Sequence, residues 1–438
     1  MRPSSRRRRR GSLPGRRRRT ALVVLALLSA LAVLPALAAL PAPSGARVDA
    51  GSATHGRSGR LPEAHVQAQA QTPTHAQTPT QAQTPTPTPT QLIVAARPGR
   101  EPTIRDGIDY PHRDAANRRR LAADLGAARA ARRASPRDPA ARARVRSLDA
   151  IARAADARRH PDRALVSYVP GRDPLAAVSI GDLDAASHVT FAVPGMGTTT
   201  ADMQMWAEAA QDLWSEQGEV GAPDDRAVVA WMGYHAPEPG IDATTGDHAR
   251  RGAPLLAAAI QGLRAARAAG PRPTVDVVAH SYGSTMAADA LAARDLGVRS
   301  FVMLGSAGVE RAIPDAAALH VRRAYAAEAA DDWDAIWGRL SRRDPRGAGF
   351  GATVFGVDGD DAEELLGVTG HAPVLHSAWN DDPSSRAWTR IADPVLRAQR
   401  YTAHQEAFGY LDVGTESLRN TAVATTPGAR ERLTHVGG

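Results

Sequence analysis

The fold is best indicated by one segment, Val275-Asp276-Val277-Val278-Ala279-His280-Ser281-Tyr282-Gly283-Ser284. An apolar run of strand character leads into Ser281, and an alanine-rich helical pattern follows it. Ala279 and Gly283, two positions either side of the serine, are small, as a sharp strand-to-helix turn requires because the two backbones nearly touch there. Such a turn exposes the serine hydroxyl and strains its backbone, at a cost of roughly 1–3 kcal/mol.

This turn has the layout of a nucleophile elbow, the site of the reactive serine in α/β-hydrolases. The five-residue pattern alone is weak, because glycine and alanine are common enough for it to arise by chance on the order of once. The alternative is a buried serine in an ordinary strand–helix turn. The segments around it favour the elbow.

Strand-like and helical segments alternate after residue 165, which predicts a mainly parallel, doubly wound sheet with helices on both faces. The expected strands are 189–193, 227–232, 275–278, 301–304, 321–325 and 352–355. The expected helices include 200–217, 254–268 and 284–294. Ligands bind at the carboxyl ends of the strands in such sheets, so the functional residues are expected there.

A glycine-rich turn, Pro194-Gly195-Met196-Gly197-Thr198-Thr199, follows the first of these strands. An acyl-transfer enzyme needs backbone N–H groups aimed at the point where the oxyanion forms. We expect Met196 or Gly197 to supply one donor, and the amide of Tyr282 to supply the other. A plain glycine turn is the alternative.

A reactive serine also needs a carboxylate that orients its histidine base. Asp332, which follows the 321–325 strand, is the favoured residue, and Asp331 and Glu328 are the alternatives. A solvated residue that caps the next helix is the other interpretation of Asp332.

The base follows the acid along the chain in α/β-hydrolases, which leaves His404, His371, His376 and, with less support, His435. His404 is preferred because it precedes 408–412 and an expected final helix, where the last loop of the fold would end. His371 and His376 lie in an insertion after the last expected strand.

The first 41 residues are expected to form a secretory signal or an uncleaved membrane anchor. Ten arginines and no acidic residue lie within residues 1–20, and an apolar run extends from there to Leu40. The segment Ala36-Leu37-Ala38 offers a small-x-small cleavage site. The arginines are expected to stay inside and the rest of the chain to be exported, to the extracellular side or the outer face of the cytoplasmic membrane.

Two further segments precede the expected catalytic domain. Residues 42–96 are rich in Pro, Thr and Gln and cannot bury apolar area, so we expect a linker without a packed core. Residues 97–165 are rich in Arg and Ala, with apolar residues three and four apart and a break at 135–139, which predicts a helical hairpin. This hairpin is expected to pack on an α/β-hydrolase domain formed by residues 166–438.

Composition excludes several classes of function. The net charge is +8, and the ten arginines of residues 1–20 supply +10, which leaves −2 for the rest of the chain and argues against a nucleic-acid partner. The chain has no cysteine, so disulfides and thiolate metal sites are excluded. No motif for a cofactor or a catalytic metal is recognised, and the sequence does not indicate an oligomeric state.

Several motifs together resemble the actinobacterial α/β-hydrolases grouped as domain of unknown function 1023, over about residues 114–424. They are Ala177-Val178-Ser179-Ile180-Gly181-Asp182-Leu183-Asp184, 194–198, Trp231-Met232-Gly233-Tyr234-His235-Ala236-Pro237, 279–284, and Tyr410 with 414–420. The resemblance implies that Ser281 is the nucleophile and Asp332 the acid. The family usually has its histidine three residues before the tyrosine that matches Tyr410, where this chain has Ala407, and His404 is the nearest substitute.

The sequence therefore predicts an exported serine hydrolase that cleaves an ester, thioester or amide through an acyl-enzyme on Ser281. Its expected partners are a small-molecule or lipid-like acyl substrate and the cell envelope. The displaced histidine leaves one alternative, a catalytically inactive α/β-hydrolase domain that acts as an envelope-binding module.

Overall fold

The computed structural model describes residues 108–377 and 380–437. The expected signal segment at 1–41 and the expected linker at 42–96 lie outside these residues. Within the described part of the chain, none of the helices is both long enough and apolar enough to cross a bilayer.

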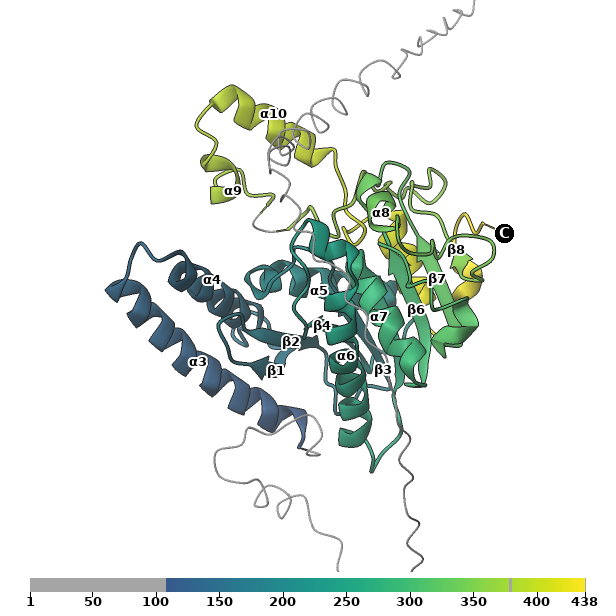
Figure 1. The fold of residues 1–438 in the computed structure, drawn as a ribbon, viewed down its shortest axis with the longest axis horizontal. Coiled ribbons are helices and arrows are strands. Elements are labelled where there is room, and N and C mark those ends of the chain that lie inside the picture. Colours follow the sequence, from purple (N-terminus) through teal and green to yellow (C-terminus); the bar gives the residue numbers. More distant parts are fainter. Residues whose placement is uncertain (1–107, 378–379, 438) are drawn as a thin grey trace, which may run out of the picture. The chain divides into compact units, whose positions relative to one another are not determined.

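Eight strands form one sheet in the order β1-β2-β4-β3-β5-β6-β7-β8 (Figure 1). Strands β4, β3, β5, β6, β7 and β8 run parallel, and β1, β2 and β4 pair antiparallel. Strands β3 to β6 are buried along nearly their whole length, which is why they read in the sequence as apolar runs. The strands are β1 Arg163–Val169, β2 Leu175–Ile180, β3 His188–Val193, β4 Arg226–Met232, β5 Thr274–His280, β6 Val298–Leu304, β7 Arg323–Ala327 and β8 Thr353–Val354.

All six expected strands are present, but β1 and β2 were not predicted. Strand β1 crosses residue 165, the expected boundary between the hairpin and the catalytic domain. Its pairing with β2 shifts between Leu165 and Ser167, and this bulge interrupts the two-residue alternation that indicates a strand. The antiparallel strands β1 and β2 extend the parallel sheet beyond β4.

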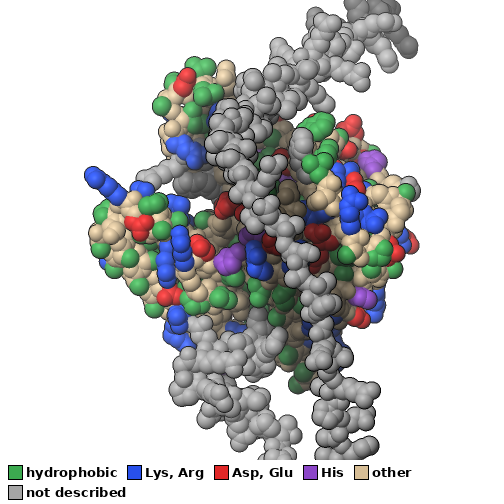
Figure 2. All heavy atoms as spheres, viewed as in Figure 1, with side chains coloured by type: hydrophobic (Ala, Val, Ile, Leu, Met, Phe, Trp, Pro, Cys, Tyr) green, Lys and Arg blue, Asp and Glu red, His purple; other side chains and the backbone are tan. Residues whose placement is uncertain are grey.

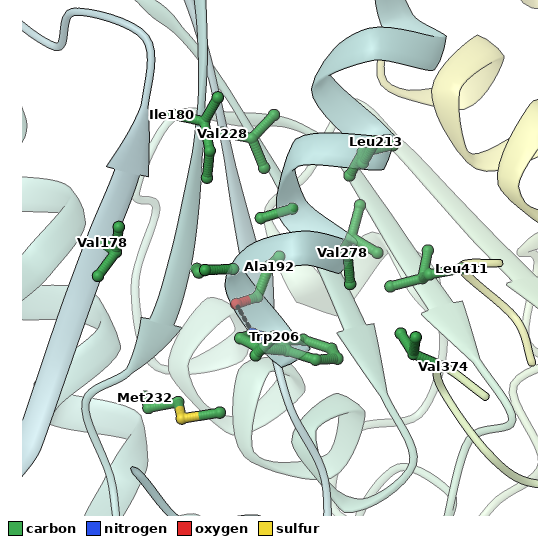
Figure 3. Close-up of a cluster of buried hydrophobic side chains, with 14 of the residues drawn as sticks. Val178, Ile180, Ala192, Trp206, Leu213, Val228, Met232, Val278, Val374 and Leu411 are labelled. Atoms are coloured by element: carbon green, nitrogen blue, oxygen red, sulfur yellow. Dashed lines mark hydrogen bonds between the residues drawn. The ribbon is translucent and has the colours of Figure 1, made fainter. Parts of the chain in front are cut away.

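Helices cover both faces of the sheet. Helix α5 (Met203–Glu219) and helix α11 (Glu416–Ala424) pack on one face, and α6 (Asp247–Ala266) and α7 (Tyr282–Ala293) pack on the other. Figure 3 shows part of the core on the α5 side, where Trp206 lies near Val278, Val374 and Leu411. The indole Nε1 of Trp206 donates a hydrogen bond to the Ala192 carbonyl at 3.0 Å, so this large side chain is buried without an unpaired polar group.

The expected hairpin consists of α3 (Tyr110–Ala134) and α4 (Pro139–Ala154). Leu148 and Ile151 of α4 are fully buried in the same core as α5. Helix α3 lies along β1, where the Asp114 carboxylate accepts a hydrogen bond from the Leu165 amide at 2.6 Å and Asn117 donates to the Leu165 carbonyl at 2.8 Å. Arginine side chains stand on the outer surface of this hairpin, the lobe at the left of Figure 2.

The chain after β8 returns to the sheet by a long route. It passes through two helices, α9 (Arg386–Thr389) and α10 (Pro394–Gln405), before it enters α11. None of the residues of α10 is buried. The final described residue, Gly437, donates its amide to the Val354 carbonyl at 3.0 Å and so lies beside β8.

Candidate active site

Ser281 stands at the turn between β5 and α7, as the sequence predicts. Its φ of 53° and ψ of −127° are unfavourable for a residue with a side chain, which is the strain expected of a nucleophile elbow. The Leu304 carbonyl accepts its amide hydrogen bond at 2.9 Å and fixes the turn on β6. A Cβ at Gly283 would lie 2.5 Å from the Pro194 carbonyl oxygen, so this position tolerates only glycine.

His371 is the histidine that contacts Ser281. Its Nε2 lies 2.7 Å from the Ser281 Oγ, and its Nδ1 lies 2.7 Å from Oδ1 of Asp332. Asp332 follows β7 and is 1% exposed, whereas the His371 side chain is 17% exposed. The three residues occur in the chain order serine, aspartate, histidine, which is the order of the α/β-hydrolase triad.

Hydrogen bonds hold Asp332 in its ionised form. Burial opposes ionisation, but hydrogen bonds from His371, the Ala335 amide at 3.0 Å and the Tyr410 hydroxyl at 2.7 Å outweigh it, so the pKa of the Asp332 carboxyl is lowered. Burial, together with the Asp332 charge, raises the pKa of Tyr410, which therefore remains a donor. The carboxylate is thus both charged and fixed in position.

A second histidine, His280, supports the backbone of His371. Its Nε2 lies 2.7 Å from the His371 carbonyl oxygen, which can only accept a hydrogen bond. Burial, followed by the proximity of His371, lowers the pKa of His280 to about 3, so the ring is neutral and its one proton is on Nε2. His280 thus positions the residue that contacts the serine.

The prediction that His404 contacts Ser281 is wrong. His404 lies in the last turn of α10, and its Nε2 contacts Asp381 at 2.9 Å instead of the Ser281 hydroxyl. His376 contacts the same carboxylate at 2.9 Å, and His435 contacts Glu416 at 2.7 Å. Of the candidate histidines, the structure brings only His371 to the serine.

The two alternative acids are also placed elsewhere. Asp331 is exposed to solvent next to Asp332. The Glu328 side chain is 4% exposed and forms an ion pair with Arg339 and a second one with Arg346 at 3.0 Å. Asp332 is thus the carboxylate that the structure brings to His371.

The insertion explains why sequence reasoning chose the wrong histidine. The Tyr410 amide donates to the Ala372 carbonyl at 3.1 Å, so Tyr410 lies beside His371 in space. Along the chain, however, α9 and α10 separate the two residues. The contributions of Tyr410 and His280 were not predicted either; the only signal was that His280 directly precedes the serine and that Tyr410 is part of a recognised motif.

The glycine-rich turn lies against the elbow. The amides of its two candidate oxyanion donors, Met196 and Gly197, differ in their hydrogen bonding. The Gly197 amide donates to the Pro237 carbonyl at 2.8 Å, so the expectation that Gly197 stabilises an oxyanion is wrong. Within the described part of the chain, the amides of Met196 and Tyr282 have no acceptor. Tyr282 is the first residue of α7, where amides lack an intrahelical partner and the helix dipole favours negative charge.

Gly195 is the residue of this turn nearest to the serine. A Cβ there would lie 2.6 Å from the Ser281 Cβ and 2.8 Å from the His280 carbonyl oxygen. We therefore expect Gly195→Ala to push the turn away from the elbow and to lower kcat/KM by about 10²-fold, the typical cost of a 1 Å misplacement. Ester hydrolysis measured beside Gly171→Ala, whose Cβ would have no atom nearer than 3.7 Å, tests this; equal activities of the two variants would contradict it.

Comparisons with known proteins agree with this architecture. Residues 170–341 match a family model described as alpha/beta hydrolase. An uncharacterized protein of Mycobacterium tuberculosis is 30% identical over 251 residues, which cover 48% of this chain and 38% of that protein. An uncharacterized protein of Mycobacterium bovis is 32% identical over 161 residues, 34% of this chain and 60% of that protein. The chain thus matches less than two thirds of the length of each of these relatives.

Solved structures with similarity to the chain include two hydrolases. Dienelactone hydrolase from Anabaena variabilis is 18% identical with a TM-score of 0.28, over 43% of this chain and 88% of that chain. A predicted CIB-like hydrolase from Thermoplasma acidophilum is 14% identical with a TM-score of 0.29, over 54% and 99% of the two chains. The sheet order, the elbow at Ser281 and the family match over residues 170–341 together show that the chain has the α/β-hydrolase fold.

Proposed function

We propose that the chain is a serine hydrolase that cleaves an ester, thioester or amide through an acyl-enzyme on Ser281. The observation that carries this proposal is the continuous hydrogen-bonded series from the Ser281 hydroxyl through His371 to Asp332, with 2.7 Å at each step. A base within hydrogen-bond reach of the hydroxyl, itself oriented by a carboxylate, is the arrangement that activates a serine.

In the first half of the reaction, His371 Nε2 takes the hydroxyl proton as Ser281 Oγ attacks the carbonyl carbon. The carbonyl oxygen becomes an oxyanion, which accepts hydrogen bonds from the amides of Met196 and Tyr282. His371 then gives its proton to the leaving group, and the acyl group stays on Oγ. A water molecule, deprotonated by His371, releases the acid in the second half.

Asp332 has two tasks in this cycle. It accepts the Nδ1–H of His371, so the lone pair of the neutral ring is on Nε2, where the serine proton must go. Its negative charge also stabilises the imidazolium that forms. The donors from Tyr410 and Ala335 keep the carboxylate ionised and prevent it from rotating away.

A cavity of about 450 Å³ beside the oxyanion turn is our candidate for part of the substrate site. It lies between α4 and the turn, and its lining includes Pro194, Thr198, Tyr234 and Arg146. Sites for small molecules usually have volumes of 300–1,000 Å³. In this proposal the helical hairpin therefore forms one wall of the substrate site.

The proposal also includes the place where this hydrolase acts. The basic and apolar segment of residues 1–41 would direct the hydrolase to the outer side of the cytoplasmic membrane, where lipid-like acyl esters of the envelope are within reach. The displaced histidine was the reason to consider an inactive binding module. With His371 at the serine, that reason no longer applies.

An active-site-directed fluorophosphonate is expected to label the wild-type chain, because the activated Ser281 hydroxyl displaces its leaving group. The Ser281→Ala variant should remain unlabelled. Labelling is read as the mass of the adduct on the peptide that contains Ser281. Ser284→Ala is the matched control, since its hydroxyl contacts Ser281 O and Ser306 instead of a histidine. Absence of adduct on a folded wild-type chain would refute the proposal.

A further inference from the structure

Two histidines and an aspartate converge on one point outside the candidate active site. His376 Nδ1 and His404 Nε2 each lie 2.9 Å from the same atom, Oδ1 of Asp381. These three atoms all lie within 4.8 Å of one another. Imidazole nitrogens and a carboxylate oxygen are the ligands of zinc in proteins, and ligands around a tetrahedral zinc with bonds of about 2.0–2.1 Å lie roughly 3.3 Å apart.

The contacts of the two ring nitrogens of His376 also fit a metal ligand. His376 Nε2 lies 2.9 Å from the Ala407 carbonyl oxygen, which only accepts, so Nε2 carries a proton. Nδ1, the other ring nitrogen, is directed at the Asp381 carboxylate at 2.9 Å and is therefore the atom placed to bind an ion. A ligating histidine that donates its other N–H to a backbone carbonyl is also the usual outer-shell arrangement.

The surrounding side chains fix the ligands in place. The Tyr401 hydroxyl donates to the Asp381 carbonyl at 2.7 Å. The Trp388 ring lies edge-on to Tyr401 and 5.0 Å from the His404 ring, measured between centroids. The His404 side chain is only 9% exposed although no residue of α10 is buried as a whole. Helix α10 thus contributes no buried residue to a core of its own, and small units without a core commonly depend on a metal or another cross-link.

We propose that His376, Asp381 and His404 bind a divalent transition metal, with Zn²⁺ as the best match to the two imidazoles and one carboxylate. Water completes the tetrahedron. The ion joins α10 to the chain that follows His371, because His376 lies just after this residue and its amide donates to Asp412 at 3.0 Å. The site is structural: it fixes the α9–α10 segment next to the loop that carries His371.

Zinc binding is tested on the full chain, purified without a histidine tag and freed of metal by EDTA. Titration calorimetry with ZnCl₂ is expected to give one equivalent bound with a micromolar or lower Kd. Co²⁺ should give the visible absorption of a tetrahedral site. We expect Asp381→Asn and His404→Ala each to weaken zinc binding by about 100-fold. Asp381→Asn keeps the shape of the side chain and serves if His404→Ala does not fold.

His112→Ala is the matched control, because His112 forms an exposed histidine–aspartate pair with Asp109 at 2.6 Å and no described residue adds a third ligand. It should bind zinc as the wild type does. No stoichiometric binding, or equal affinities for wild type, Asp381→Asn and His404→Ala, would overturn the proposal and leave an adventitious ion only. Because the readout is metal and not hydrolysis, this result does not depend on the proposed activity.

Discussion

Replacement of His371 by alanine is expected to lower kcat/KM for a reactive ester by about 10⁴-fold or more. The variant has no group that can take the Ser281 proton, since the Nε2 that lies 2.7 Å from the Ser281 Oγ is removed. Initial rates with a nitrophenyl ester, measured beside circular dichroism of the folded state, give the comparison. The loss should appear in kcat, because the base acts in the transition state and not in substrate binding.

His404→Ala separates this assignment from the one that the sequence favours. Its side chain contacts Asp381 and not the serine, so its effect on kcat/KM should stay below about 10²-fold, through the placement of the α9–α10 segment. His112→Ala, at an exposed site on α3, should leave the rate unchanged. A folded His404→Ala variant that loses as much activity as His371→Ala would contradict the triad proposed above.

Asp332→Asn is expected to cost about 10⁴-fold in kcat while the fold is retained. An asparagine amide donates a hydrogen bond to His371 Nδ1, which forces the ring proton onto Nε2, where it blocks transfer from Ser281. Asp331→Asn is the control, because that carboxylate is exposed and lies beside the site. Equal rates for the two variants would show that the carboxylate does not act through His371.

The Asp332→Asn substitution should also change how the stability of the fold depends on pH. The pKa of Asp332 in the folded chain is lowered from 3.8, so its ionised form stabilises the fold at higher pH. That contribution is fully present above the unfolded pKa and is lost as the pH falls through the folded pKa. Thermal melts of wild type and Asp332→Asn below pH 5 should therefore converge as the pH falls.

The features that could be predicted from the sequence are those that depend on residues close together in the chain. The elbow at Ser281 requires small residues at fixed offsets, and the buried strands are apolar runs, so both can be recognised locally. The pair of Ser281 and Asp332 also follows from chain order. β1 was missed because a bulge interrupts its alternation.

The rest of the site depends on contacts between distant segments. His371 and Tyr410 become neighbours only because the chain leaves the sheet after His371, forms α9 and α10, and comes back. Gly197 could not be excluded as an oxyanion donor without knowing that Pro237, from another loop, accepts its amide hydrogen. No local pattern encodes either contact.

The contact between α3 and β1 has a consequence for solubility. An outer strand presents free backbone groups that can recruit a strand from another molecule and start aggregation. Here Asp114 and Asn117 occupy the amide and carbonyl of Leu165, so a helix fills the place of an incoming strand. A chain that lost this helix would expose a templating edge along β1, and such a variant would be prone to self-association.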